Sequence, residues 1–114
     1  MIHQFEIGAY TIKIGRRFAT RVGDENVTAI GFISCVGEDF LNVNVYFVDD
    51  EGPVPEPTLS RDGNVGTLFL RREMMPIWTD LLRNEKPIFG FIDTARPEAT
   101  YITTKLETIG EEES

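Results

Sequence analysis

The segment Val27-Thr28-Ala29-Ile30-Gly31-Phe32-Ile33-Ser34-Cys35-Val36 decides the fold class of this chain. Its residues are mostly β-branched, aromatic or small, and apolar side chains occupy both odd and even positions. A strand that is apolar on both faces is typical of the middle of a sheet, because neighbouring layers cover it. We therefore predict a central strand over residues 27–36, with Gly31 allowing a bulge or the close approach of another element.

The next segment, residues 40–48, alternates between apolar and polar positions and predicts a second strand. Leu41, Val43, Val45 and Phe47 are expected on the core face, and the residues between them on the other face. Two of the residues on that second face are aromatic, Phe40 and Tyr46. Aromatic side chains on a face that should be wet indicate that another surface covers them, so both are candidate binding residues.

The N-terminal residues predict an opening hairpin. Phe5 and Ile7 precede a break at Gly8, and residues 10–14 then alternate until Gly15 ends the second strand. A short further strand is expected over residues 17–22, with Arg17 and Arg21 on its wet face.

One helix is predicted at about residues 74–84, after a short strand over residues 65–70. The spacing i, i+3, i+4, i+7, i+8 is met by Met74, Ile77, Trp78, Leu81 and Leu82. Pro76 suits a first helical turn, and Asn84 is expected to end the helix in the left-handed conformation. Trp78 is expected to fill the core, with an interface anchor as the alternative.

The element order defines the expected architecture. A final hairpin is predicted from residues 88–93 and 99–106. We expect a mainly β fold: a small antiparallel barrel or strongly bent sheet of about six to eight strands, with the helix before the last hairpin. From residue 27 onward the order is also that of an oligonucleotide-binding barrel, although no motif supports that analogy. Residues 1–109 are expected to form one domain, and residues 110–114 an acidic disordered tail.

A long connection over residues 49–64 contains three prolines and has no repeating apolar face. Loops of this length are uncommon in compact domains and often carry contacts, although a plain connection is the alternative. The contact candidates within it are Asp49, Asp50, Pro53, Pro55 and Arg61.

Composition and motifs restrict the chemistry. A net charge of −8 disfavours binding to nucleic acid, and no apolar run is long enough to predict a membrane span or a secretory signal, so we expect a cytoplasmic protein. One histidine, His3, and one cysteine, Cys35, offer no metal-ligand or nucleophile spacing, and Cys35 is expected to be buried. We expect no metal, no cofactor and no catalytic residue.

The leading functional prediction is a non-enzymatic protein-binding or structural domain that forms a homodimer. One alternative is a small-ligand-binding barrel or carboxylate-dependent enzyme, whose pocket Trp78 would close and Tyr46, Arg21 or Arg71 would line. The other alternative is an acidic mimic of nucleic acid that blocks a basic protein.

Overall fold

The computed structural model describes residues 1–22, 25–49 and 54–104, and it is mainly β. Its elements follow in the order β1 (Ile2–Glu6), β2 (Ala9–Val22), β3 (Glu25–Val36), β4 (Asn42–Val48), β5 (Thr58–Leu59), β6 (Val65–Arg71), the 3-10 turn η1 (Arg72–Met74), α1 (Met75–Asn84), β7 (Ile88–Asp93), the 3-10 turn η2 (Pro97–Ala99) and β8 (Tyr101–Thr104).

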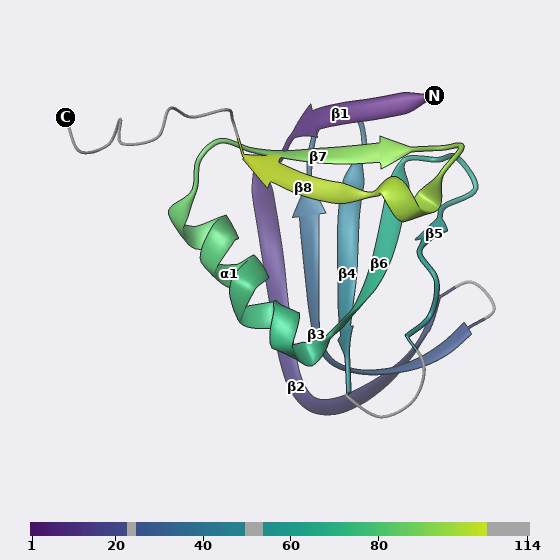
Figure 1. Cartoon of the computed structure of the whole chain (residues 1–114), viewed down its shortest axis with the longest axis vertical. Coiled ribbons are helices and arrows are strands. Elements are labelled where there is room, and N and C mark those ends of the chain that lie inside the picture. Colours follow the sequence, from purple (N-terminus) through teal and green to yellow (C-terminus); the bar gives the residue numbers. More distant parts are fainter. Residues whose placement is uncertain (23–24, 50–53, 105–114) are drawn as a thin grey trace.

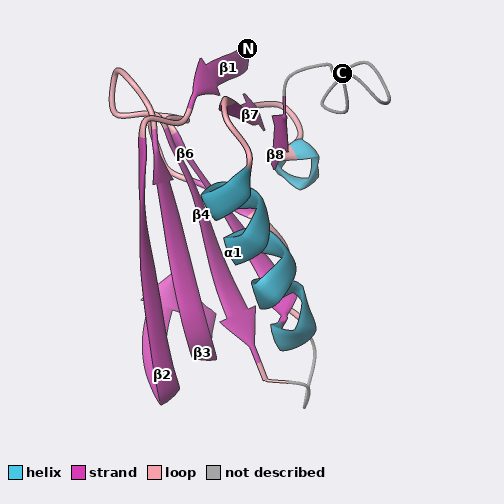
Figure 2. Cartoon of the chain, turned by 90° about the vertical axis from the view of Figure 1, so that its left-hand side faces the viewer, coloured by secondary structure: helices cyan, strands magenta, loops and turns pink. Residues whose placement is uncertain are grey.

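The described strands form two sheets. The larger has the strand order β2-β3-β4-β6-β5, and the smaller has the order β1-β7-β8. The strands of the small sheet run across one end of the large sheet (Figure 1). The helix α1 lies against one face of the large sheet (Figure 2). We call this the helix face, and the other side the reverse face.

The predicted central strand is confirmed as β3, which pairs antiparallel with β2 on one side and β4 on the other. Ile33 and Cys35 are fully buried on it. The register of β3 against β4 shifts between Ala29 and Gly31, and a Cβ built on Gly31 would clash with the side chain of Met75. Both uses predicted for Gly31, a bulge and a close approach, are therefore realised.

The main core lies between α1 and the helix face. Its buried members include Ile33, Val43, Val45, Phe47, Leu68, Met75, Trp78 and Leu82, and Phe5, Ile88 and Ile92 join it from the small sheet. The Trp78 ring meets Phe47 edge-on, with the ring centroids 6.4 Å apart. The predicted helix is therefore confirmed, but its buried stripe is Met75, Trp78 and Leu82, whereas Ile77 is largely exposed.

The reverse face carries an aromatic row. Tyr46 lies between Phe32 of β3 and Phe69 of β6, with ring centroids 4.6 Å and 5.8 Å away. The far end of β3 curls back over this face, since Val27 packs with Val48 and Phe69. Tyr46 thus occupies the face predicted for it, and its neighbours in the same sheet partly cover it.

Phe40 does not lie on that face, so the prediction that Phe40 and Tyr46 share one face of a strand is wrong. The strand β4 begins at Asn42, and Phe40 lies in the preceding turn, where both Asp39 and Phe40 have positive φ. The turn is closed by the Leu41 amide, which donates to the Glu38 carbonyl. Phe40 is 87% exposed because the turn directs it away from both faces.

The expected opening hairpin is also wrong. The strand β1 pairs antiparallel with β7 of the small sheet, whereas β2 pairs with β3 of the large sheet. Gly8 therefore marks the place where the chain passes from one sheet to the other. Beyond it, β2 runs from residue 9 to residue 22 as one strand, and the break predicted at Gly15 is a bulge between Ile14 and Phe18.

The predicted barrel is not formed by the described residues, which build two sheets and no closed barrel. The all-antiparallel arrangement is wrong as well, because β4 and β6 pair in parallel. Because the two strands are parallel, the chain has to return from the end of β4 to the level of its start before β6 begins. Within that connection, Thr58 and Leu59 form β5 and pair with β6, so the segment contributes to the sheet after all.

Asn84 does not adopt the left-handed conformation expected of it. It stays within α1, and the helix ends as the chain becomes extended at Glu85, whose amide donates to the Leu81 carbonyl. The final hairpin is confirmed as β7 and β8, whereas its predicted end at Leu106 and the acidic tail lie outside the described residues.

Candidate functional site

The strand β2 is an edge of the large sheet. Among the described strands it has one neighbour, β3, and its other side carries no strand. An edge strand presents backbone N–H and C=O groups that can pair with another chain. The candidate site is therefore the row of backbone donors and acceptors along the edge of β2. The side chains beside this row determine which partner can bind to it.

The first part of this edge, residues 9–14, carries apolar side chains on the helix face. Tyr10, Ile12 and Ile14 are opposite Cys35, Ile33 and Gly31 of β3 and therefore point to the same side. Ile14 is 73% exposed and Tyr10 38% exposed, while Ile12 is half-buried against the core. The reverse face of the same segment carries Thr11 and Lys13, both exposed.

The second part of β2 is protected against pairing. The bulge between Ile14 and Phe18 interrupts the regular ladder, and Arg16 and Arg17 are exposed within it. Bulges and charged side chains are the usual means by which proteins prevent edge strands from pairing. The open part of the edge is therefore limited to residues 9–14.

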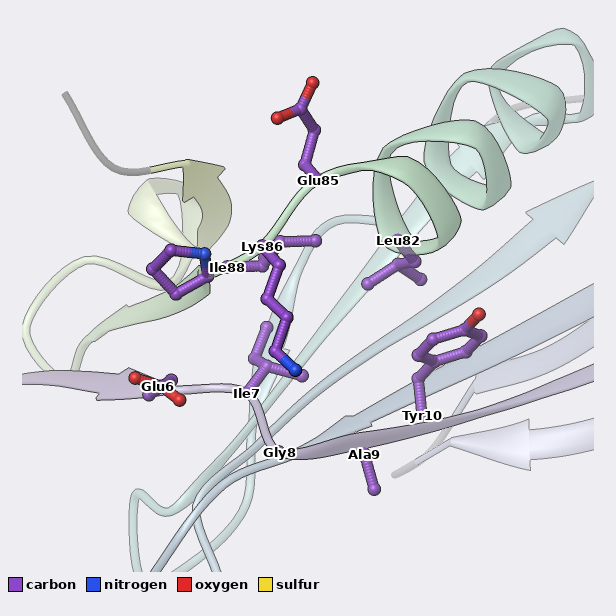
Figure 3. Close-up of a pocket in the computed structure, with 10 residues that line it drawn as sticks. Glu6, Ile7, Gly8, Ala9, Tyr10, Leu82, Glu85, Lys86 and Ile88 are labelled. Carbon is purple, nitrogen blue, oxygen red and sulfur yellow. The ribbon is translucent and has the colours of Figure 1, made fainter. Parts of the chain in front are cut away.

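A crevice of about 530 Å³ adjoins the start of this edge (Figure 3). Tyr10 rises from β2 toward the turn of α1 that carries Leu82, and Lys86 extends toward the start of the strand, while Glu85 points away. The walls of the crevice are thus apolar near α1 and charged at the rim. Sequence reasoning noted the alternation of residues 10–14 but missed this site, because nothing local reveals which strand of a sheet is an edge.

The predicted pocket closed by Trp78 and lined by Tyr46 is not formed. Trp78 is buried on the helix face, whereas Tyr46 lies on the reverse face of β4. Arg21 is exposed on the far part of β2, opposite Asn26 of β3. The sheet itself separates the residues that were expected to meet.

Arg71 lies beside Asp49, and this pair joins two of the predicted contact residues. Nη1 of Arg71 donates to the Asp49 carbonyl oxygen at 3.4 Å, and the Asp49 carboxylate forms an ion pair with Arg17. Asp50 and Pro53 lie outside the described residues, Pro55 is half-buried, and Arg61 is exposed.

The turn after β5 is organised by Asp62. Its Oδ1 accepts from the Ser60 hydroxyl at 2.6 Å and from the Asn64 amide at 3.1 Å. These hydrogen bonds, first that of Ser60 and then that of Asn64, lower the pKa of the Asp62 carboxyl, because they stabilise its ionised form. The turn is therefore built around a charged carboxylate.

Cys35 is fully buried in the core, as the sequence predicts. Desolvation raises the pKa of its thiol to about 12, since no charged partner offsets the loss of water around the thiolate. Such a thiol is neutral and inert at neutral pH. Within the described ranges, no three metal-ligating side chains come together.

Comparison with known proteins yields no match to a protein-family model, to a curated protein or to a solved structure. In the part of the chain that the structure describes, no helix has the length and apolar character needed to span a bilayer.

Proposed function

We propose that this chain is a protein-binding domain whose partner is a second copy of itself, joined along residues 9–14 of β2. The observation that supports the proposal is the exposed apolar row on an edge strand, with Ile14 73% exposed. Pairing would add one strand to each large sheet and would satisfy the backbone groups of both edges at once. It would also cover the apolar row, which water otherwise contacts.

The sequence of the edge suits a twofold arrangement. In an antiparallel pair centred on Ile12, each Tyr10 lies opposite Ile14 of the second copy, and the two Ile12 side chains face each other. An aromatic ring opposite a β-branched side chain is a favourable cross-strand pair, contributing roughly 0.2–1 kcal/mol. On the reverse face Thr11 is opposite Lys13 of the second copy, so no like charges meet directly.

Long-range charge opposes this association. Each chain carries a net charge of −8, so two copies repel each other. Salt screens that repulsion but leaves apolar burial intact, and moderate salt should therefore strengthen the dimer.

The first test is the mass in solution, measured by light scattering after size exclusion at micromolar concentration and at low and moderate salt. We expect the chain to have twice its 12.9 kDa mass at moderate salt. Ile14→Lys should give the monomer mass, because it places a charge in the apolar row, opposite Tyr10 of the second copy. The matched control is Ile77→Lys, which also replaces an exposed isoleucine, but on α1. A monomer at both salt concentrations, or equal effects of the two substitutions, would contradict the proposal.

A second test concerns the register. Thr11→Cys and Lys13→Cys face each other in the pair centred on Ile12, whereas either variant alone places its two thiols about 8 Å apart on the diagonal. A disulfide needs Cα atoms within about 7 Å. Mixing the two variants under mild oxidation should therefore give cross-linked dimer, and each alone much less. Cross-linking that is no greater in the mixture would exclude this register.

A further inference from the structure

A second feature of the surface lies at the bulge in β2, between Ile14 and Phe18. Arg16, Arg17, Ile30, Asp49 and Arg72 line a cavity of about 510 Å³. We call these five residues and the space between them the arginine pocket. They come from four separate parts of the chain, so the fold brings them together and local sequence does not.

Two bulges at the same level of the sheet supply one side of the pocket. The register of β2 against β3 shifts between Ile14 and Phe18, which releases Arg16 and Arg17 from the ladder. The register of β3 against β4 shifts between Ala29 and Gly31, which releases Ile30. Bulges redirect side chains and are over-represented beside functional sites. Here the residues released by both bulges line the same cavity.

The carboxyl ends of two parallel strands supply the other side. Val48 of β4 is opposite Arg71 of β6, so Asp49 and Arg72, the next residue of each strand, leave the sheet side by side. The Asp49 carboxylate contacts Arg17, and its Oδ1 lies 3.9 Å from Nη1 of Arg72. Asp49 therefore lies between guanidinium groups from opposite walls.

The balance of charge in the pocket is opposite to that of the whole chain. Three arginines and one aspartate line the cavity among the residues that the structure describes, so cationic side chains outnumber anionic ones in this lining. The chain as a whole carries −8. Arg16 makes no hydrogen bond or ion pair with any described residue. An exposed, unpaired guanidinium at the cavity wall is a ready donor to an anion.

We propose that the arginine pocket binds a small molecule that carries two or more phosphate groups. Guanidinium forks match phosphate oxygens in a bidentate manner, and several forks in one pocket match several phosphate groups. A cavity of about 510 Å³ falls within the usual range for small-molecule sites. A long nucleic acid is disfavoured, because the chain as a whole carries a net charge of −8 and repels a polyanionic backbone.

The test uses inorganic pyrophosphate as the probe, with inorganic phosphate and sulfate beside it, and titration calorimetry at low salt as the measurement. We expect pyrophosphate to bind at least tenfold more tightly than either single anion. Arg16→Gln should weaken that binding at least tenfold, while Arg83→Gln, an exposed arginine on α1, should leave it within twofold. Arg16 is exposed, so its replacement should not alter the thermal midpoint of the protein.

Asp49→Asn should change the affinity for pyrophosphate in the opposite direction to Arg16→Gln. It removes a carboxylate that forms ion pairs with Arg17 and Arg72, so pyrophosphate should bind more tightly to this variant than to the unchanged protein. If the arginines serve only as an internal ion-pair network, Asp49→Asn lowers stability and pyrophosphate does not bind at millimolar concentration. That result, or equal weakening by Arg16→Gln and Arg83→Gln, would overturn the proposal.

The proposal is independent of self-association. Pyrophosphate should bind to the Ile14→Lys variant at least as tightly as to the unchanged protein, since Ile14 does not line the arginine pocket and the added lysine attracts anions at low salt. Loss of binding in that variant alone would instead place the anion at the interface between copies, and would overturn the assignment to this pocket.

Discussion

Gly31 of β3 lies directly against Met75 of α1: a Cβ at position 31 would stand 2.6 Å from the Met75 Cε. The first turn of the helix can approach the central strand this closely because glycine has no side chain. The contact anchors α1 at its N-terminal end, while Trp78 and Leu82 anchor the turns that follow.

Replacing Gly31 by alanine should therefore destabilise the protein by about 1–2 kcal/mol, because the added methyl group displaces the buried end of the Met75 side chain, which is flexible and can shift at modest cost. Denaturant titration measures the change. Gly8→Ala is the matched control: nothing lies within 4 Å of its Cβ position, so a change below about 1 kcal/mol is expected. In a Met75→Ala background the cost of Gly31→Ala should nearly vanish. A full cost in that background would show that Met75 is not the cause.

Trp78→Ala should lower the free energy of unfolding by roughly 3–5 kcal/mol, because the ring is buried and its removal leaves a cavity beside Phe47. The measurement is again the denaturant midpoint. Ile77→Ala, one residue earlier on the exposed side of α1, should change it by about 0.5 kcal/mol or less. A small effect of Trp78→Ala would return Trp78 to the role of an interface anchor.

Cys35 should react with a thiol reagent at pH 8 only when the protein unfolds, because the side chain is fully buried and its pKa is raised to about 12. The rate of labelling should therefore follow the rate of opening and increase with denaturant. Rapid labelling of the native protein would contradict the burial of Cys35.

The same pKa determines how stability depends on alkaline pH. The unfolded thiol titrates near 9.0 and the folded thiol near 12, so the unfolded chain loses its proton first. The stability associated with the thiol is complete below pH 9 and falls by about 1.4 kcal/mol per pH unit until the folded thiol titrates. Cys35→Ala should lack this slope. Parallel pH curves for the two proteins would rule the effect out.

Asp62 should produce a dependence at acidic pH with the opposite direction. Its folded pKa lies below the ordinary value of 3.8, so its contribution is present above that value and disappears as the pH falls through the folded pKa. Ser60→Ala removes the principal hydrogen bond and should make the loss shallower. The measurement is the free energy of unfolding between pH 2 and pH 6 for the two proteins, and identical slopes would contradict the role of Ser60.

Much of the secondary structure could be read from local pattern. The central strand β3, the helix α1 and the final hairpin were predicted because each has a repeating apolar period or a turn signal of its own. The burial of Trp78 and Cys35 followed from the same patterns. The turn at Phe40 was not predicted, because the alternation of apolar and polar residues in the following strand continues back through it. Nothing in that pattern indicates the left-handed conformation of Asp39 and Phe40.

The candidate sites were much less accessible from the sequence. Phe40 and Tyr46 were expected to share a strand face, and a pocket closed by Trp78 was expected to be lined by Tyr46, Arg21 or Arg71. The structure places these residues on a turn, on two faces of the sheet and at separate strand ends. The alternation of apolar and polar residues assigns a side chain to one of the two faces of a sheet. It does not specify which element packs against that face. The arginine pocket was missed for this reason, since its residues are distant along the chain.

The sequence by itself determined that the chain is mainly β with one helix, and which residues form its central strand and much of its core. These properties depend on side chains a few positions apart, and the periods of 2.0 and 3.6 residues record them directly. Only the tertiary structure decided that β1 pairs with β7, that β6 lies parallel to β4, and that β2 is an edge. Distant segments of similar composition could pair with one another in several ways. The packing of the whole core, rather than any local preference, determines which strands become neighbours.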